Sequence, residues 1–120
     1  MNFCWTTIKV TNMEKSLKFY QEIVGLPLVR RVGAWPETDI AFLGEGQTMI
    51  ELICSRGVNS VSFGKDISLG FETESLEDLM AFLKEKGVAI HSGPFQPNPH
   101  IKFIYVTDPD GLTIQFVQNM

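Results

Sequence analysis

Side chains that could do chemistry recur in four short stretches of the chain, each with an alternating pattern. In every stretch one set of alternate residues is apolar, and the residues between them are mixed in character. The mixed sets are Trp5, Thr7 and Lys9; Met49, Glu51 and Ile53; Asp66, Ser68 and Gly70; and Thr113, Gln115 and Val117. Because successive side chains of a β-strand point to opposite faces, each mixed set is expected on one face of a sheet.

These mixed faces suit neither bulk water nor a dry core. Trp5 and Met49 are too apolar for a plain solvent face, whereas Glu51, Asp66 and Gln115 are too polar for a core. A concave, half-apolar pocket with a few convergent polar groups accounts best for the combination. The alternative is a solvated sheet face with scattered apolar residues, on which Glu51 is a surface carboxylate and Asp66 only begins a strand.

The first half of the chain supplies one helix and four strands. The strands are expected at residues 5–10, 28–32, 39–43 and 48–54, which lie between breaks rich in glycine and proline. The helix is expected to begin after Thr11, because Thr11 and Glu14 have the spacing of a capping box. Gly25 ends this helix, and Pro27 prevents its continuation.

The second half repeats the same order. Its strands are expected at residues 66–71, 88–91, 101–107 and 112–118, with a turn at residues 108–111 before the last one. Thr73 or Ser75 can cap a helix that ends at Gly87. Residues 49–53 match residues 113–117, and residues 5–10 match residues 66–71.

This duplication predicts an α+β fold of two tandem βαβββ modules, at about residues 1–57 and 64–120. A module of about 50 residues is too small to bury both faces of its sheet alone. We therefore expect one domain over residues 1–120, a curved and partly open barrel-like sheet of eight strands with the helices outside. The apolar alternate residues, Ile67, Leu69 and Phe71 among them, are expected to pack on the helices.

Length and composition exclude several classes of protein. The 120 residues carry 10 basic and 14 acidic side chains, a formal net charge of −4, so no nucleic-acid partner is expected. No apolar run reaches the roughly 18 residues of a membrane span, and no signal peptide is visible. Cys4 and Cys54 form no disulfide framework and are expected as small core residues of a cytoplasmic protein.

Three segments together resemble the vicinal oxygen chelate superfamily, which includes glyoxalase I, extradiol dioxygenases and bleomycin-binding proteins. They are VTNMEKSLKFY at residues 10–20, followed by Val24, Gly25 and Leu26; MIELI at 49–53; and DPDGLTIQFV at 108–117. The resemblance covers nearly the whole chain. It implies the paired-module fold, a small-molecule ligand and a homodimer, but the same scaffold hosts several reactions and some pure binders.

The resemblance also implies one metal position on the first and the last strand of each module. In this chain these positions are Trp5, Glu51, Asp66 and Gln115, and only Glu51 has the usual ligand type. An indole N–H only donates, so Trp5 binds no metal. Glu51, Asp66 and Gln115 could hold a hard divalent cation loosely. They lack the imidazoles that favour zinc, nickel or ferrous iron.

Three interpretations follow from these residues. The preferred one is a small-molecule binder of the glyoxalase/bleomycin-resistance type with a degenerate metal site. Its ligand contacts are Trp5, Thr7, Met49, Ser68 and Gln115, and the indole of Trp5 can form an aromatic wall. The alternative is a lyase or isomerase of the lactoylglutathione lyase type with Glu51 as general base. A partner domain with an empty pocket is the third interpretation.

Four residues outside the matched stretches complete the expectations. His91 and His100 flank a proline-rich stretch, residues 92–99, which is expected to be a rigid connector with both imidazoles exposed. His100 at the pocket rim is the less favoured alternative. Trp35 and Phe63 are expected to be exposed, which supports a homodimer.

Overall fold

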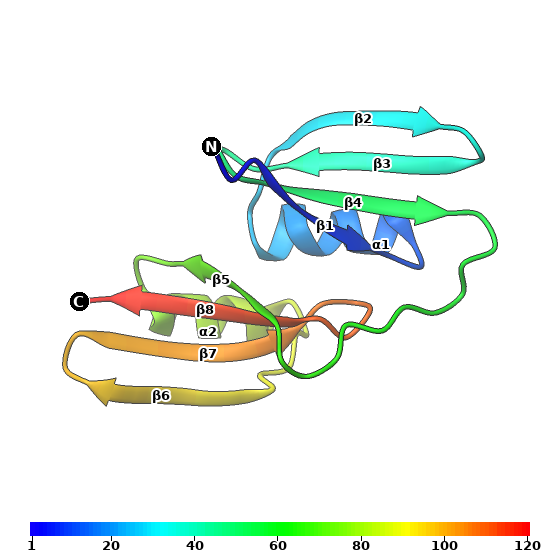
Figure 1. Cartoon of the computed structure of the whole chain (residues 1–120). Helices are drawn as coiled ribbons and strands as arrows, with labels where there is room; N and C mark the ends of the chain where they lie inside the picture. Colours follow the sequence, from blue (N-terminus) through cyan, green and yellow to red (C-terminus); the bar gives the residue numbers. More distant parts are fainter. The chain divides into compact units, whose positions relative to one another are not determined.

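The computed structural model describes residues Met1–Met120, and the chain divides into two compact units, Met1–Ser62 and Phe63–Met120. Each unit has the order strand, helix and three strands, which confirms the tandem βαβββ modules. The strands form two separate four-stranded sheets rather than one closed barrel. Figure 1 shows α1 along one face of the first sheet and α2 along one face of the second.

The first unit contains β1 (Trp5–Lys9), α1 (Met13–Lys18), η1 (Phe19–Ile23), β2 (Leu28–Ala34), β3 (Thr38–Leu43) and β4 (Met49–Ser55). The strand order in the sheet is β1-β4-β3-β2, with β1 parallel to β4 and the other pairs antiparallel. The core lies on the helical side and includes Ile8, Val10, Leu17, Tyr20, Leu43 and Leu52. The alternation of β1 and β4 therefore sends the apolar set to the helix, as predicted.

The first helix begins one residue later than predicted. Asn12, not Thr11, is the N-cap, and its Oδ1 accepts a hydrogen bond from the Lys15 N–H at 3.0 Å. The side-chain oxygen of Asn12 thus satisfies one of the backbone N–H groups at the helix start, the role that was predicted for Thr11. Glu14 accepts a hydrogen bond from Arg31 on β2 at 2.7 Å.

Arg31 ties the helix to the sheet through two carboxylates. Its guanidinium also binds Asp39 on β3, with donor–acceptor distances of 2.7 and 3.1 Å. The hydrogen bond to Asp39, and after it the one to Glu14, raise the pKa of the Arg31 guanidinium above its usual value. Arg31 therefore links α1 to β2 and β3 through charge-assisted hydrogen bonds at the surface.

The second unit contains β5 (Ser68–Glu72), α2 (Leu76–Glu85), β6 (Ser92–Asn98), β7 (Ile101–Thr107) and β8 (Thr113–Asn119), in the sheet order β5-β8-β7-β6. Ser75 is the N-cap of α2, and its Oγ accepts from the Asp78 N–H at 3.2 Å. Gln118 on β8 accepts from the Leu76 N–H at 2.8 Å, so the helix start is attached to the sheet.

The prediction of a strand at residues 88–91 is wrong, and so is the prediction of a rigid connector at residues 92–99. The chain there has no regular structure until β6, and β6 consists of the proline-rich stretch itself. A proline cannot donate to a sheet ladder, and such residues are tolerated where the strand lies at an edge. Because β6 is the edge strand, Pro94 and Pro97 are accommodated by two irregularities in its pairing with β7.

The strand register shifts the correspondence between the two units by two residues. Trp5 pairs with Met49 in the first sheet, and Ser68 pairs with Thr113 in the second. Since Met49 and Thr113 begin equivalent strands, Ser68 and not Asp66 is the structural counterpart of Trp5. Asp66 precedes β5, and Ile67 is 61% exposed instead of packing on the helix as predicted.

Three further expectations concern cysteines and exposed residues. Cys4 is exposed, so the prediction of a core position is wrong for it, whereas Cys54 is half-buried and both thiols are free. Trp35 is 93% exposed, but Phe63 is half-buried and not exposed as predicted. None of the helices has the length and hydropathy needed to cross a lipid bilayer.

Candidate functional site

The mixed face of the first sheet carries an oriented carboxylate. Thr7 and Glu51 lie opposite each other on β1 and β4, and the Thr7 hydroxyl donates to Glu51 Oε1 at 2.5 Å. Glu51 is half-buried between Met49 and Ile53. Because one oxygen is held by Thr7, the other is available to accept a proton or a hydrogen bond from a ligand.

An aromatic pair and a cation lie beside this carboxylate. Trp5 is 44% exposed, and its ring meets that of Phe42 edge to face at a centroid distance of 5.3 Å. Phe42 is paired with Glu51 across β3 and β4, and the Arg30 guanidinium stands 4.5 Å from its ring centroid. The Trp5 indole thus packs against Phe42 on one side, and the rest of its ring is exposed. A ligand could contact this exposed part of the ring.

Phe42 and Arg30 were not identified from the sequence. Their positions on this face depend on how β2 and β3 pair with β4, and alternation within a single strand does not reveal that pairing. Once residues 39–43 are placed antiparallel to residues 49–54, Phe42 falls opposite Glu51. The signal therefore lay in the register and not in the composition.

The second sheet presents an amide and a phenol at the equivalent place. Gln115 on β8 lies between Gly70 on β5 and Tyr105 on β7, and its Nε2 donates to the Tyr105 hydroxyl at 3.4 Å. A Cβ at position 70 would stand 3.4 Å from Gln115 Oε1. Gly70 therefore leaves the amide room that its counterpart Thr7 fills with a hydroxyl in the first unit.

Two cavities adjoin Tyr105 in the second unit. One, of about 310 Å³, is lined by Lys65, Asp66, Ile67, Ser68, His91, Ser92, Tyr105 and Thr113. The other, of about 560 Å³, is lined by Phe95, Gln96, Pro97, Phe103 and Tyr105. Asp66 and Ser68, both predicted site residues, are thus brought together with an imidazole, and Tyr105 is shared by a polar and an apolar cavity.

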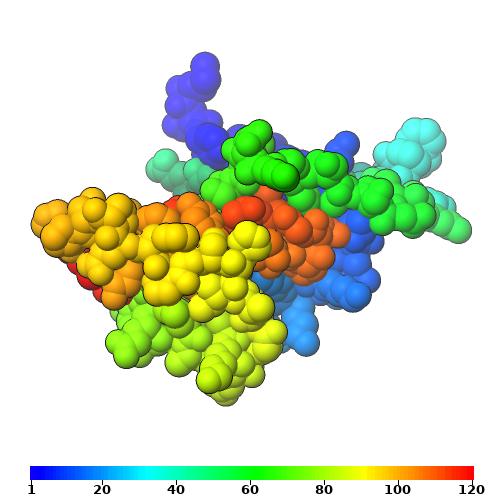
Figure 2. Space-filling view, turned by 90° about the horizontal axis from the view of Figure 1, so that it is seen from below, coloured from blue at the N-terminus to red at the C-terminus, as the bar shows by residue number.

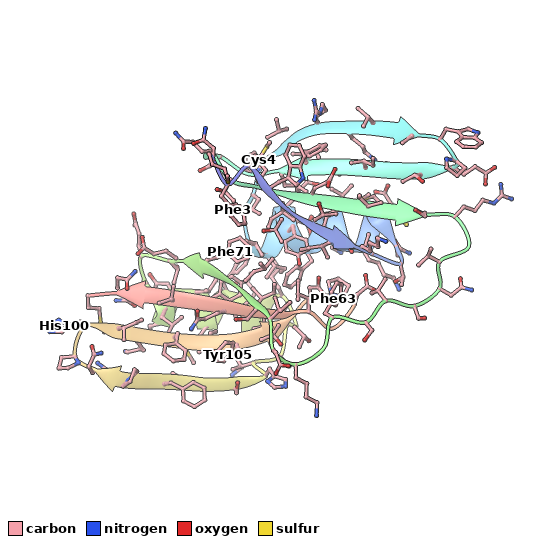
Figure 3. All side chains as sticks on the ribbon, in the orientation of Figure 1. Phe3, Cys4, Phe63, Phe71, His100 and Tyr105 are labelled. Carbon is pink, nitrogen blue, oxygen red and sulfur yellow. The ribbon has the colours of Figure 1, made fainter.

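The imidazole near the site is His91 rather than His100. His91 lies just before β6, and its backbone N–H donates to the Tyr105 carbonyl at 2.7 Å. His100 lies in the turn between β6 and β7, at the far end of the hairpin from Tyr105 (Figure 3). No residue spacing favoured His91, because the imidazole comes near Ser68 only through pairing between strands that are far apart in the chain.

The structure therefore groups the predicted residues in two sets. Trp5, Thr7, Met49 and Glu51 share the mixed face of the first sheet. Ser68 and Gln115 share a face of the second sheet, and Asp66 lines the polar cavity at its edge. The convergence of both sets on one ligand stays a prediction.

The donor set does not fit the divalent metal that the fold family implies. The implied positions are Trp5, Glu51, Asp66 and Gln115, and the strand register adds Ser68 beside Asp66. Together these residues provide two carboxylates, one amide oxygen, one hydroxyl and no imidazole. In neither unit do three His, Cys, Asp or Glu side chains gather. Transition metals favour imidazole or thiolate ligands, and hard cations bind through a larger set of oxygen ligands than two carboxylates, an amide and a hydroxyl supply.

Comparison with known proteins agrees with the fold. The family model of the Glyoxalase/Bleomycin resistance protein/Dioxygenase superfamily matches residues 3–116. A lactoylglutathione lyase of Neisseria meningitidis is 31% identical over 127 aligned residues, which cover 98% of this chain and 91% of that protein. A lactoylglutathione lyase of Haemophilus influenzae is 30% identical, with coverages of 99% and 93%.

Solved structures give the same result. Glyoxalase I of Leishmania major, described as trypanothione-dependent, superposes with a TM-score of 0.83 at 25% identity, covering 98% of this chain and 86% of that one. TnmS3, an antibiotic-binding protein from Streptomyces sp. CB03234, has the same fold, with a TM-score of 0.79 at 23% identity and coverages of 100% and 97%.

Proposed function

Because the chain belongs to the Glyoxalase/Bleomycin resistance protein/Dioxygenase superfamily, we propose that it is a small-molecule-binding protein with a degenerate metal site. The observation that carries the proposal is the set of residue types at the implied metal positions, where Trp5, Asp66 and Gln115 stand in place of the usual His or Glu. An exposed indole, a hydroxyl and an amide are suited to contacting a half-apolar organic molecule. Trp5, Thr7, Met49, Ser68 and Gln115 are the proposed contacts.

A lyase of the lactoylglutathione lyase type is the second candidate. It is favoured by the names of the relatives at 30–31% identity and by the orientation of Glu51. In this function Glu51 would act as general base, taking a proton from a carbon of the substrate with the oxygen that Thr7 leaves available. The residues at the implied metal positions include no cationic group that would stabilise the negative charge developing on the substrate.

Metal content and turnover of matched variants separate the two candidates. We expect purified protein to contain well under one equivalent of nickel, zinc, iron or manganese, and to show no lactoylglutathione lyase activity when these ions are added. Glu51→Ala and the exposed control Glu22→Ala should have the same low metal content and the same lack of lyase activity as wild type. One equivalent of metal in wild type and Glu22→Ala that is lost in Glu51→Ala would overturn the binder and favour the lyase.

We also propose a homodimer in the cytoplasm. A sheet edge with unpaired backbone groups is commonly covered by a second copy. Every residue of the edge strand β2 is exposed, and Trp35 follows it at the hairpin turn. Two free thiols are in keeping with a reducing compartment.

A further inference from the structure

We propose that the second unit selects ligands with an aromatic ring joined to a polar head of no net charge, bound across Tyr105. This inference rests on the proposed binding function and names the class of ligand for one of its two sheet faces. It follows from the position of Tyr105, which lines both the aromatic cavity and the polar cavity.

The aromatic half is a cluster of three rings on one face of the β6–β7 hairpin. Phe95 and Phe103 are register partners with a centroid distance of 5.5 Å, and Phe103 meets Tyr105 at 5.7 Å. Phe95 remains 43% exposed, so it has ring surface to offer. Figure 2 shows residues of β6 and β7, in yellow and orange, side by side at the surface of this unit. Rings at such spacings receive another planar ring by stacking or edge contact.

The polar half is rich in hydroxyl groups. Ser68, Ser92, Tyr105 and Thr113 line it together with His91, whose Nδ1 lies 3.4 Å from Ser92 Oγ. The Tyr105 hydroxyl accepts from Gln115, so its own proton is available to an acceptor on the ligand. These groups can donate to and accept from a head that carries both kinds of polar atom.

The charges in the polar cavity offset each other. Lys65 and Asp66 are adjacent in the chain and both line the cavity, and both are exposed. A carboxylate head would be attracted by Lys65 and repelled by Asp66, and an ammonium head the reverse. Because the attraction and the repulsion cancel, neither charged head gains net attraction to offset the hydration that it loses on binding. An uncharged head such as an amide loses less hydration and still gains hydrogen bonds, so the cavity favours it.

A series of naphthalenes with different heads tests this selection. The probes are 2-naphthamide, 2-naphthoate and 2-naphthylmethylamine, titrated calorimetrically into the intact chain at low salt, where exposed charges are least screened. We expect wild type to bind the amide roughly threefold to tenfold more tightly than either charged analogue. Asp66→Asn should raise the affinity for 2-naphthoate to that for 2-naphthamide. Lys65→Met should likewise raise the affinity for 2-naphthylmethylamine to that for the amide.

Three variants complete the design. Phe95→Ala should weaken all three probes by a similar factor of roughly five or more, since it removes ring contact and leaves the polar cavity intact. Val29→Ala, which shortens an exposed residue on the edge strand of the other unit, and Lys102→Met, on the opposite face of β7, should leave every affinity unchanged.

The outcomes separate this inference from the proposed function. Binding of 8-anilinonaphthalene-1-sulfonate is measured in parallel as a general test of a half-apolar ligand site. If that dye binds while the naphthalene series shows no head preference, no response to Asp66→Asn or Lys65→Met, or no binding below about 1 mM, the inference is wrong and the binding function stands. If neither the dye nor any naphthalene binds, both are wrong.

Discussion

At the scale of single residues, Trp5 and Glu51 could be predicted because each lies in a strand whose alternation is visible in the sequence. The residues that surround Trp5 and Glu51 could not be predicted from the sequence. Thr7 holds Glu51 by a hydrogen bond that needs β1 and β4 in one particular register, and Phe42 reaches the site only through a further strand. His91 beside Ser68 likewise depends on pairing between residues far apart in the chain.

Ser16 gives a stability prediction at this scale. It lies inside α1, fully buried, and its hydroxyl makes no hydrogen bond. Burying an unpaired hydroxyl is unfavourable, and alanine is the better helix former, so Ser16→Ala should raise the free energy of unfolding by about 1 kcal/mol. Urea denaturation measures the change.

Ser75 is the matched control for this prediction. It is a serine at the start of the other helix whose hydroxyl does cap a backbone N–H, so Ser75→Ala should lower the free energy of unfolding by about 1 kcal/mol. Two changes of the same sign would show that the Ser16 hydroxyl is satisfied in solution.

At the scale of elements, the sequence predicted seven of the eight strands in place and missed β6. Proline and glycine in residues 92–98 are typical of a connector, and only an edge position makes them compatible with a strand. The start of the first helix was predicted one residue too early. Thr11 and Asn12 are both good caps, and only the backbone conformation decides between them.

Gly93 provides the test of β6. Its φ is +101°, and a Cβ there would stand 3.0 Å from the Phe103 carbonyl oxygen. Gly93→Ala should therefore lower the free energy of unfolding by roughly 2–3 kcal/mol, through backbone strain and the contact with β7 together. Hydrogen exchange of the β7 amides should rise in the same variant.

Gly87, at the end of α2, is the control that separates backbone strain from the steric contact with β7. Its φ is +74°, but nothing lies within 4 Å of an added Cβ. Gly87→Ala should cost only about 1 kcal/mol, from backbone strain alone. Equal losses in the two variants would mean that residues 92–98 do not pair with β7 as described.

At the scale of the whole molecule, the internal repeat made the fold predictable. Matching residues 5–10 to residues 66–71 aligns Trp5 with Asp66, whereas the strand register aligns Trp5 with Ser68, and both residues line the polar cavity, so the role of Asp66 in the site stays a prediction. Residue types are similar at either offset, and only the pairing of β5 with β8 distinguishes them.

The central claim is that the mixed sheet faces bind a small organic molecule without metal. Its most direct test is a ¹H–¹⁵N NMR titration with 8-anilinonaphthalene-1-sulfonate in the presence of EDTA. We predict saturable shifts of the Trp5 indole N–H and the Gln115 side-chain amide. The Trp35 indole at the hairpin turn and the Gln118 amide on the helical side of β8 should stay unchanged. Shifts of Trp35 and Gln118 in place of Trp5 and Gln115, or shifts that require a divalent cation, would contradict the account.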